Sequence, residues 1–163
     1  MKKKTILFTI LFLIIEEGLK YLICHIINGG TISIIPNFFS LSYVENTGAA
    51  WSILRGRRYL LIGISIIMLF AIASIQKGLP ERKLNYLSFS FLYAGVLGNL
   101  ADRTLFGAVK DFFSFNFFGY EFPVFNVADI YIVISIILII ILIIKGGKNE
   151  VTESPKREEN KNW

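Results

Sequence analysis

The chain has 163 residues, of which 54% are hydrophobic, and its formal net charge at pH 7 is +5. A mean hydropathy of +0.59 is too high for a soluble domain of this length, so the composition favours a small integral membrane protein. One cysteine and one histidine cannot supply a zinc site, which argues against metalloprotease chemistry, and the basic residues flank apolar runs instead of forming a nucleic-acid-binding stripe.

Four apolar segments approach the length of about 20 residues that a helix needs to cross a bilayer. We predict membrane-spanning helices over residues 5–27, 59–76, 84–103 and 125–144. The first segment also resembles a secretory signal peptide, because three lysines precede its apolar run. However, the acidic stretch EEGLK stands where a cleavage site needs small residues, and the apolar pattern resumes after it. We therefore interpret this segment as an uncleaved span.

The distribution of lysine and arginine predicts how these spans are oriented. Four spans place both termini on one side, and with cytoplasmic termini the inner segments carry eleven basic residues against five in the outer segments. The positive-inside rule therefore predicts cytoplasmic termini, although a cluster of arginines at residues 55–58 opposes this orientation. Residues 147–163 are charged and poor in apolar side chains, which predicts a disordered cytoplasmic tail.

The segments outside the membrane are rich in aromatic residues. Residues 28–57 combine glycine and proline breakers with near-alternating stretches such as TISII and FFSLSYV, which predict short strands. We expect them to lie along the membrane surface as an amphipathic platform. In the second outer segment, residues 104–124, alternation around VKDFF predicts a short extended piece from which Asp111 projects beside the membrane.

Asp129 stands at the head of the most apolar stretch in the chain. An aspartate inside bilayer hydrocarbon costs roughly 2.5 to 3.5 kcal/mol, so it is rarely kept without a partner or a function. If Asn126 is the N-cap of the last span, Asp129 is the third residue of that helix and lies near the outer surface. Because Asp111 approaches the same surface, the two residues form an aspartic dyad in outline.

Two carboxyl groups a few ångströms apart in a poorly hydrated site share a proton near neutral pH, because both cannot ionise cheaply. The ionised member can then activate a water while the protonated member donates to a peptide carbonyl, which is hydrolysis without a metal or other cofactor. The spacing alone leaves plainer roles open. Asp129 can simply stabilise the helix N-terminus, and Asp111 can be a solvated loop acid beside Lys110.

Other polar residues are expected near the same surface. In GNLADR, residues 98–103, Asn99 and Arg103 lie four apart on one helical face, and Asp102 can pair with a neighbour or cap a loop. In ENTGAA, residues 45–50, Asn46 and Gly48 predict a turn whose free amides can bind an extended peptide. Each motif alone is weak, since asparagine and glycine near helix ends are commonly just caps.

Four motifs together resemble the lipoprotein signal peptidases, also called signal peptidase II: NTGAAW (46–51), GNLADR (98–103), VKDFF (109–113) and FNVAD (125–129). The resemblance implies an all-α membrane fold, a peptidase domain over residues 1–146 with four transmembrane helices and a small extracytoplasmic β-cradle over residues 28–57. It also implies a location in the bacterial cell membrane, with the active site near the outer face, and we expect a monomer.

The family's activity is intramembrane aspartic proteolysis without a cofactor. Its members cleave the signal peptide from diacylglyceryl-modified prolipoproteins just before the lipidated cysteine, and globomycin inhibits them. The family's catalytic aspartates match Asp111 and Asp129. By the same resemblance, the substrate-binding residues are Asn46, Gly48, Asn99, Arg103, Asn126 and Ala128, and the structural supports are Glu16, Lys20 and Asp102.

The first span departs from the family pattern. The family usually has Asp-Gln-any-Thr-Lys, whereas this chain has EEGLK, so Lys20 is kept while Glu16 is one methylene longer. The i, i+4 spacing of Glu16 and Lys20 predicts an intramembrane ion pair, and Glu17 has no predicted partner. Tyr131 is bulkier than the residue usual at its position and is predicted to narrow the cleft. These changes put efficiency or substrate preference in doubt more than the reaction type.

Two readings from other functional classes compete with a peptidase. A small four-helix proton-coupled drug transporter would use Glu16 or Glu17, but it has no use for a 30-residue outer segment or for acids at positions 111 and 129. A non-catalytic divergent relative would bind lipidated peptides as a scaffold, with EEGLK as the sign of drift.

Overall fold

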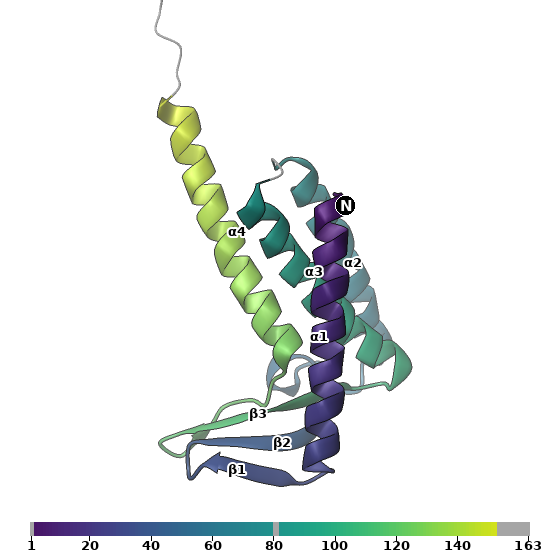
Figure 1. Cartoon of the computed structure of the whole chain (residues 1–163). Coiled ribbons are helices and arrows are strands. Elements are labelled where there is room, and N and C mark those ends of the chain that lie inside the picture. Colours follow the sequence, from purple (N-terminus) through teal and green to yellow (C-terminus); the bar gives the residue numbers. More distant parts are fainter. Residues whose placement is uncertain (1, 80–81, 153–163) are drawn as a thin grey trace, which may run out of the picture.

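The computed structural model describes residues 2–79 and 82–152, and it contains a helix at each of the four predicted positions (Figure 1). The helices are α1 (Lys3–Ile27), α2 (Arg58–Lys77), α3 (Lys83–Leu105) and α4 (Val127–Thr152). The last helix continues past residue 144 to Thr152, so it enters the segment that was expected to be disordered. The rest of that predicted tail, residues 153–163, lies outside the described residues.

The helices present apolar side chains outward and pack through α3, which contacts each of the other three. Among the described residues, Arg58–Lys77 and Val127–Ile144 are long and apolar enough to cross a membrane by length and composition. The helices α1 and α3 have 25 and 23 residues, but both carry more polar residues, several of them buried. Polar side chains of these helices are therefore placed in the contacts between helices. For example, Gln76 Nε2 donates to Thr5 Oγ1 over 2.8 Å and joins α2 to α1.

Two glycines of α3 allow close approach of its neighbours. A Cβ atom on Gly95 would lie 2.5 Å from the backbone oxygen of Ala128, so the first turn of α4 packs directly on the α3 backbone. A Cβ atom on Gly98 would lie 2.5 Å from Glu16 Oε2, so this glycine makes the space in which the Glu16 side chain of α1 is buried. Glycine at these positions therefore sets the spacing of α1, α3 and α4.

All strands lie at one end of the helices, in a single antiparallel sheet of order β1-β2-β3-β4 (Figure 1). They are β1 (Thr31–Ile35), β2 (Phe39–Asn46), β3 (Val109–Phe117) and β4 (Tyr120–Glu121), and a short 3₁₀ turn, η1 (Ala50–Ser52), follows β2. The predicted extended piece around Asp111 is therefore not isolated. It is β3, which pairs with β2, so the sheet is wider than the expected cradle of residues 28–57.

The sheet is amphipathic. Its register pairs Leu41 with Phe113 and Phe39 with Phe115, which gathers apolar side chains on one face. The Phe115 ring stacks on the Phe125 ring, 5.8 Å between centroids, just before α4 begins, so this face is turned toward the helices. The pairs Thr31–Ser42 and Ser40–Ser114 fall on the opposite face and give it hydroxyl groups.

The packing at Gly95 predicts that Gly95→Ala is destabilising, because the added methyl group must displace the α4 backbone. Overpacking of this kind costs typically about 1 to 3 kcal/mol. Gly63→Ala in α2 is the matched control, since a Cβ atom there meets nothing within 4 Å. Free energies of unfolding measured in detergent should fall for Gly95→Ala and not for Gly63→Ala. Equal stability of the two variants would contradict the close contact.

Candidate active site

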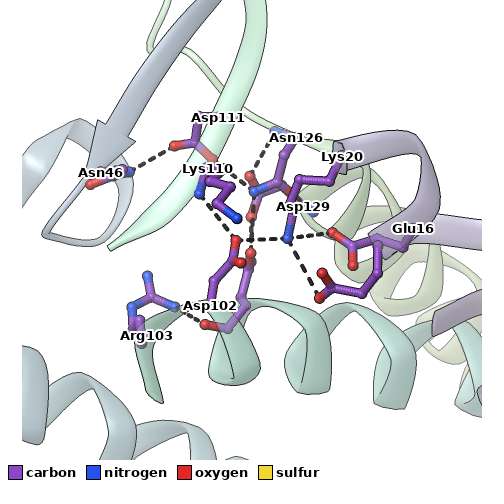
Figure 2. A network of polar contacts seen from close by, with 11 residues as sticks. Glu16, Lys20, Asn46, Asp102, Arg103, Lys110, Asp111, Asn126 and Asp129 are labelled. Carbon is purple, nitrogen blue, oxygen red and sulfur yellow. Dashed lines mark hydrogen bonds and ion pairs between the residues drawn. The ribbon is translucent and has the colours of Figure 1, made fainter. Parts of the chain in front are cut away.

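Asp111 and Asp129 line the same cleft, which has a volume of about 620 Å³. Asp111 comes from β3 and Asp129 from the first turn of α4, so the cleft lies where the sheet meets the helices (Figure 2). The predicted convergence of these two carboxyl groups at one site therefore agrees with the structure. Asparagine side chains connect them.

Asp129 is held by the residue that begins its helix. The backbone N–H of Asn126 donates to Asp129 Oδ2 over 3.1 Å, and the backbone N–H of Asp129 donates to Asn126 Oδ1 over 3.1 Å. This reciprocal pair is a capping box, with Asn126 as the N-cap and Asp129 at the third helical position, as predicted from the sequence. One carboxylate oxygen of Asp129 is thereby fixed by the backbone.

A chain of amide groups links the two acids. The Nδ2 group of Asn126 donates to Asp111 Oδ1 over 2.7 Å and to Asn99 Oδ1 over 3.2 Å. Asn99 Nδ2 then donates to Asp129 Oδ1 over 2.9 Å. On the other side, Asn46 Nδ2 donates to Asp111 Oδ2 over 3.0 Å. Each acid is therefore oriented by neutral donors, which fix its geometry without supplying a full positive charge.

The environment of Asp111 favours its protonated form. Asp111 is 2% exposed, and this burial, together with the nearby negative charge of Asp129, raises its pKa from 3.8 to about 7. The hydrogen bonds from Asn46 and Asn126 and the charge of Lys20 act in the opposite direction but do not offset the burial. Near neutral pH the site can thus hold one proton at Asp111, which is what a shared-proton pair requires.

Five of the predicted site residues line the cleft: Asn46, Asn99, Arg103, Asp111 and Asp129. The Arg103 guanidinium joins two of its walls, because Nη2 donates to the Gly48 carbonyl oxygen over 2.9 Å and Nη1 to the Asn99 carbonyl oxygen over 3.2 Å. The loop after β2 is closed by the Gly48 N–H, which donates to Asn46 Oδ1 over 2.9 Å.

Three residues expected to contact substrate lie behind the cleft wall instead. Asn126 and Ala128 are fully buried, and neither lines the cleft. The backbone of Ala128 packs on Gly95, so this residue belongs to the contact between α4 and α3. Gly48 also stays out of the cleft, and a Cβ atom there would lie 2.8 Å from the Ile53 carbonyl oxygen.

A buried ion cluster supports the site from α1. Lys20 Nζ lies 2.6 Å from Glu16 Oε1 and 2.9 Å from Asp102 Oδ2. The predicted pair between Glu16 and Lys20 is thus present, and Asp102 both pairs with a cation and accepts the backbone N–H of Lys110 over 3.1 Å. Figure 2 shows this path from α1 to the residue before Asp111. Glu17, which had no predicted partner, lies 4.0 Å from Lys20 Nζ.

Tyr131 does not narrow the cleft, so that prediction was wrong. Its ring lies 4.9 Å from the Phe91 ring and 5.9 Å from the Phe12 ring, between α1 and α3, and it is not among the cleft residues. The helical repeat explains the error, since a residue two positions after Asp129 faces about 200° away from it.

The cleft has apolar walls that the sequence analysis did not assign. One wall comes from Ile130, Val133 and Ile134 of α4, and another from Trp51 and Phe122. The aromatic richness of the outer segments was the available signal, but only the fold brings these rings to one place. Such walls with a few convergent polar groups suit an extended apolar ligand. Within the described part of the chain, no three His, Cys, Asp or Glu side chains are placed to hold a metal ion.

The chain is similar to known proteins over most of its length. A family model described as signal peptidase (SPase) II matches residues 8–145. Lipoprotein signal peptidases from Staphylococcus aureus strains MRSA252 and JH9 are each 37% identical over 154 residues, covering 93% of this chain and 94% of theirs.

Two solved structures are also similar. A bacterial membrane enzyme determined by the in meso method at 2.3 Å has a TM-score of 0.79 and 37% identity over 93% of this chain and 92% of its own. Another, determined at 1.9 Å, has a TM-score of 0.74 and 38% identity over 86% of this chain and 92% of its own.

The buried position of Asp111 makes a prediction that needs no activity assay. As the pH rises, the infrared band of its protonated carboxyl group should disappear with a midpoint near pH 7. The reason is that burial in the folded protein raises the pKa of Asp111 well above the usual aspartate value of about 4. The Asp111→Asn variant assigns the band by its loss. A midpoint near pH 4 would show that Asp111 is an ordinary solvated acid.

Proposed function

Because the chain belongs to the signal peptidase II family, we propose that it cleaves the signal peptide from diacylglyceryl-modified prolipoproteins as an intramembrane aspartic endopeptidase. Hydrolysis would occur just before the lipidated cysteine. The observation that carries this proposal is the presence of two carboxyl groups, joined by asparagine amides, in one apolar-walled cleft.

The dyad chemistry follows from the position of the proton. Asp111 holds the proton of the pair and donates it to the carbonyl oxygen of the scissile peptide, while Asp129 accepts a proton from the attacking water. When the tetrahedral intermediate collapses, Asp129 passes that proton to the leaving nitrogen and the intermediate returns one to Asp111. The pair is thereby restored, and the reaction needs no cofactor.

Substrate binding requires an extended peptide, because the carbonyl groups of a helical signal peptide are hydrogen-bonded and hidden from water. The polar groups of Asn46, Asn99 and Arg103 face the cleft and supply partners for the freed backbone. The apolar side chains of α4 beside Asp129 supply a surface for acyl chains, and a lipidated substrate enters sideways from the bilayer. Globomycin is expected to occupy the same cleft and inhibit the enzyme.

The remaining site residues act through others. Asn126 and Gly48 position the cleft side chains by their hydrogen bonds, and Ala128 allows α4 to approach α3. In the same way, the cluster of Glu16, Lys20 and Asp102 holds the start of β3 in place, because Asp102 accepts the N–H of Lys110.

For the topology, we propose four membrane spans within a single peptidase domain of residues 1–146, with both termini in the cytoplasm and the sheet at the outer surface of the bacterial cell membrane. Figure 1 supports this arrangement, since the N-terminal end of α1 and the far end of α4 both lie opposite the sheet. The apolar face of the sheet is turned toward the helices and hence toward the bilayer. A monomer suffices, because all proposed catalytic groups come from one chain.

The rival readings predict different behaviour. A proton-coupled transporter needs an accessible acid in the first helix, whereas Glu16 is fully buried beside Gly98 and paired with Lys20. A scaffold would bind a lipidated peptide without cutting it. Incubation of the purified protein with a diacylated prolipoprotein, with and without globomycin, followed by mass analysis of the new amino terminus, distinguishes these outcomes. Cleavage before the lipidated cysteine supports the proposal, and binding without cleavage contradicts it.

Single substitutions of the two acids should each abolish cleavage. Asp111→Asn and Asp129→Asn remove the acid and the base of the pair, so the rate should fall at least about 10²-fold to 10⁴-fold. Glu121→Gln is the matched control, because it removes an exposed carboxylate of β4 outside the cleft. Product formation is followed by mass spectrometry, and thermal unfolding in detergent verifies the fold. Normal cleavage by either aspartate variant rules out the dyad mechanism.

Cleavage should become less efficient as the pH rises. Because Asp111 acts in its protonated form and burial raises its pKa to about 7, kcat/KM should decline as pH rises through this value. Well above it the decline should be about tenfold per pH unit, the dependence of a single required proton. Initial rates at low substrate concentration measure this profile, and a constant kcat/KM from about pH 6 to about pH 9 would contradict the assigned acid.

A further inference from the structure

Three arginines lie just before or at the start of α2, and the described part of the chain binds the side chain of Arg58 but not those of Arg55 and Arg57. The Arg58 side chain is bound, with Nε 2.7 Å from the Arg103 carbonyl oxygen and Nη2 2.8 Å from the Thr104 carbonyl oxygen, so it caps the end of α3. Arg55 and Arg57 are exposed, and their side chains make no hydrogen bond or ion pair with the described residues. These two cations are therefore available to an outside partner.

Their depth points to the lipid headgroups. The helix α2, which is long and apolar enough to span a membrane, starts at Arg58 and has 20 residues, close to the length that crosses the hydrocarbon core. The residues directly before it then lie in the headgroup layer. Ile53 and Leu54, which precede the arginines, are apolar side chains that are 61% and 40% exposed.

The orientation of the chain adds a second argument. Under the proposed topology, Arg55 and Arg57 lie outside, where the positive-inside rule disfavours them. Unpaired cations at a membrane surface are stabilised by anionic headgroups, and an arginine guanidinium matches the geometry of a phosphate oxygen pair. A phosphate partner therefore explains a feature that the topology and the peptidase site leave unused.

We propose that residues 53–57 form a binding surface for anionic phospholipids, in which Ile53 and Leu54 enter the apolar boundary and Arg55 and Arg57 bind headgroup phosphates. This surface follows a wall of the cleft along the chain, because Ala49, Ala50 and Trp51 line the cleft and only Ser52 separates them from Ile53. Lipid binding at residues 53–57 would hold that wall at the membrane surface. The effect on cleavage rests on the proposed function, whereas the lipid binding itself does not.

Trp51 offers a direct reporter of the lipids around this surface, since it is 62% exposed. The chain has two tryptophans, so Trp163→Phe leaves Trp51 as the single emitter. In nanodiscs, Trp51 quenching by brominated phosphatidylglycerol is compared with quenching by brominated phosphatidylcholine at the same mole fraction. The test variant carries Arg55→Gln and Arg57→Gln, and the matched control carries Lys77→Gln and Lys83→Gln, which remove two exposed cations at the opposite ends of α2 and α3.

We expect stronger quenching by the anionic lipid in the parent and in the lysine control, and equal quenching by both lipids in the arginine variant. The local enrichment should be about fivefold for each arginine, the usual strength of a basic residue near an anionic membrane surface. Equal quenching in the parent, or a preference that survives in the arginine variant, overturns the proposal.

A cleavage assay in the same nanodiscs separates this inference from the proposed function. Raising the phosphatidylglycerol fraction should lower KM several-fold for the parent and the lysine control but not for the arginine variant. Absence of cleavage in every lipid refutes the proposed function while leaving the quenching result intact. An arginine effect that appears in neutral lipid and only with substrates carrying acidic residues after the cysteine would identify the peptide as the partner and overturn the lipid proposal.

Discussion

The arrangement of the cleft depends on the side chain of Asn126. Its carbonyl oxygen caps the N-terminus of α4 at Asp129, and its amide nitrogen donates to Asp111 on β3. One planar group of three heavy atoms therefore couples the start of a helix to a strand that arrives from another part of the chain. Since Asn126 is fully buried, these hydrogen bonds cannot be exchanged for bonds to water without loss. The relative position of the two acids follows from this constraint.

The rest of the fold distributes apolar and polar side chains in the opposite way to a soluble protein. Large apolar side chains face outward, and the polar groups are used between helices, where each needs a partner. The Glu16–Lys20–Asp102 cluster illustrates this use. Its charges are paired with one another, and Asp102 also accepts the backbone N–H of Lys110 in β3. The glycines of α3 make the space for this cluster and for the first turn of α4. The same contacts between helices therefore provide both the close packing and the polar support of the site.

Local patterns predicted much of this structure. The four helices, the capping relation of Asn126 and Asp129, and the pair of Glu16 and Lys20 follow from hydrophobic length and from i, i+3 and i, i+4 spacing. Features that depend on long-range contacts were missed or misplaced. Three such features join segments that are far apart in sequence, so no local spacing predicts them. They are the pairing of β3 with β2, the amide chain through Asn99, and the packing of Tyr131 on Phe12 and Phe91. Ala128 stands next to a cleft residue in sequence, yet it is fully buried and its backbone packs on Gly95.

In the proposed mechanism, the two carboxyl groups activate a water molecule and are not themselves nucleophiles. A single turnover in water enriched in oxygen-18 tests this mechanism, with enzyme in excess over a diacylated prolipoprotein and with the released peptide and the enzyme analysed by mass spectrometry. Direct attack by water predicts one oxygen-18 atom in the new carboxylate of the released signal peptide and none in the enzyme. An unlabelled peptide, with the label on the carboxylate of Asp111 or Asp129, would contradict this mechanism.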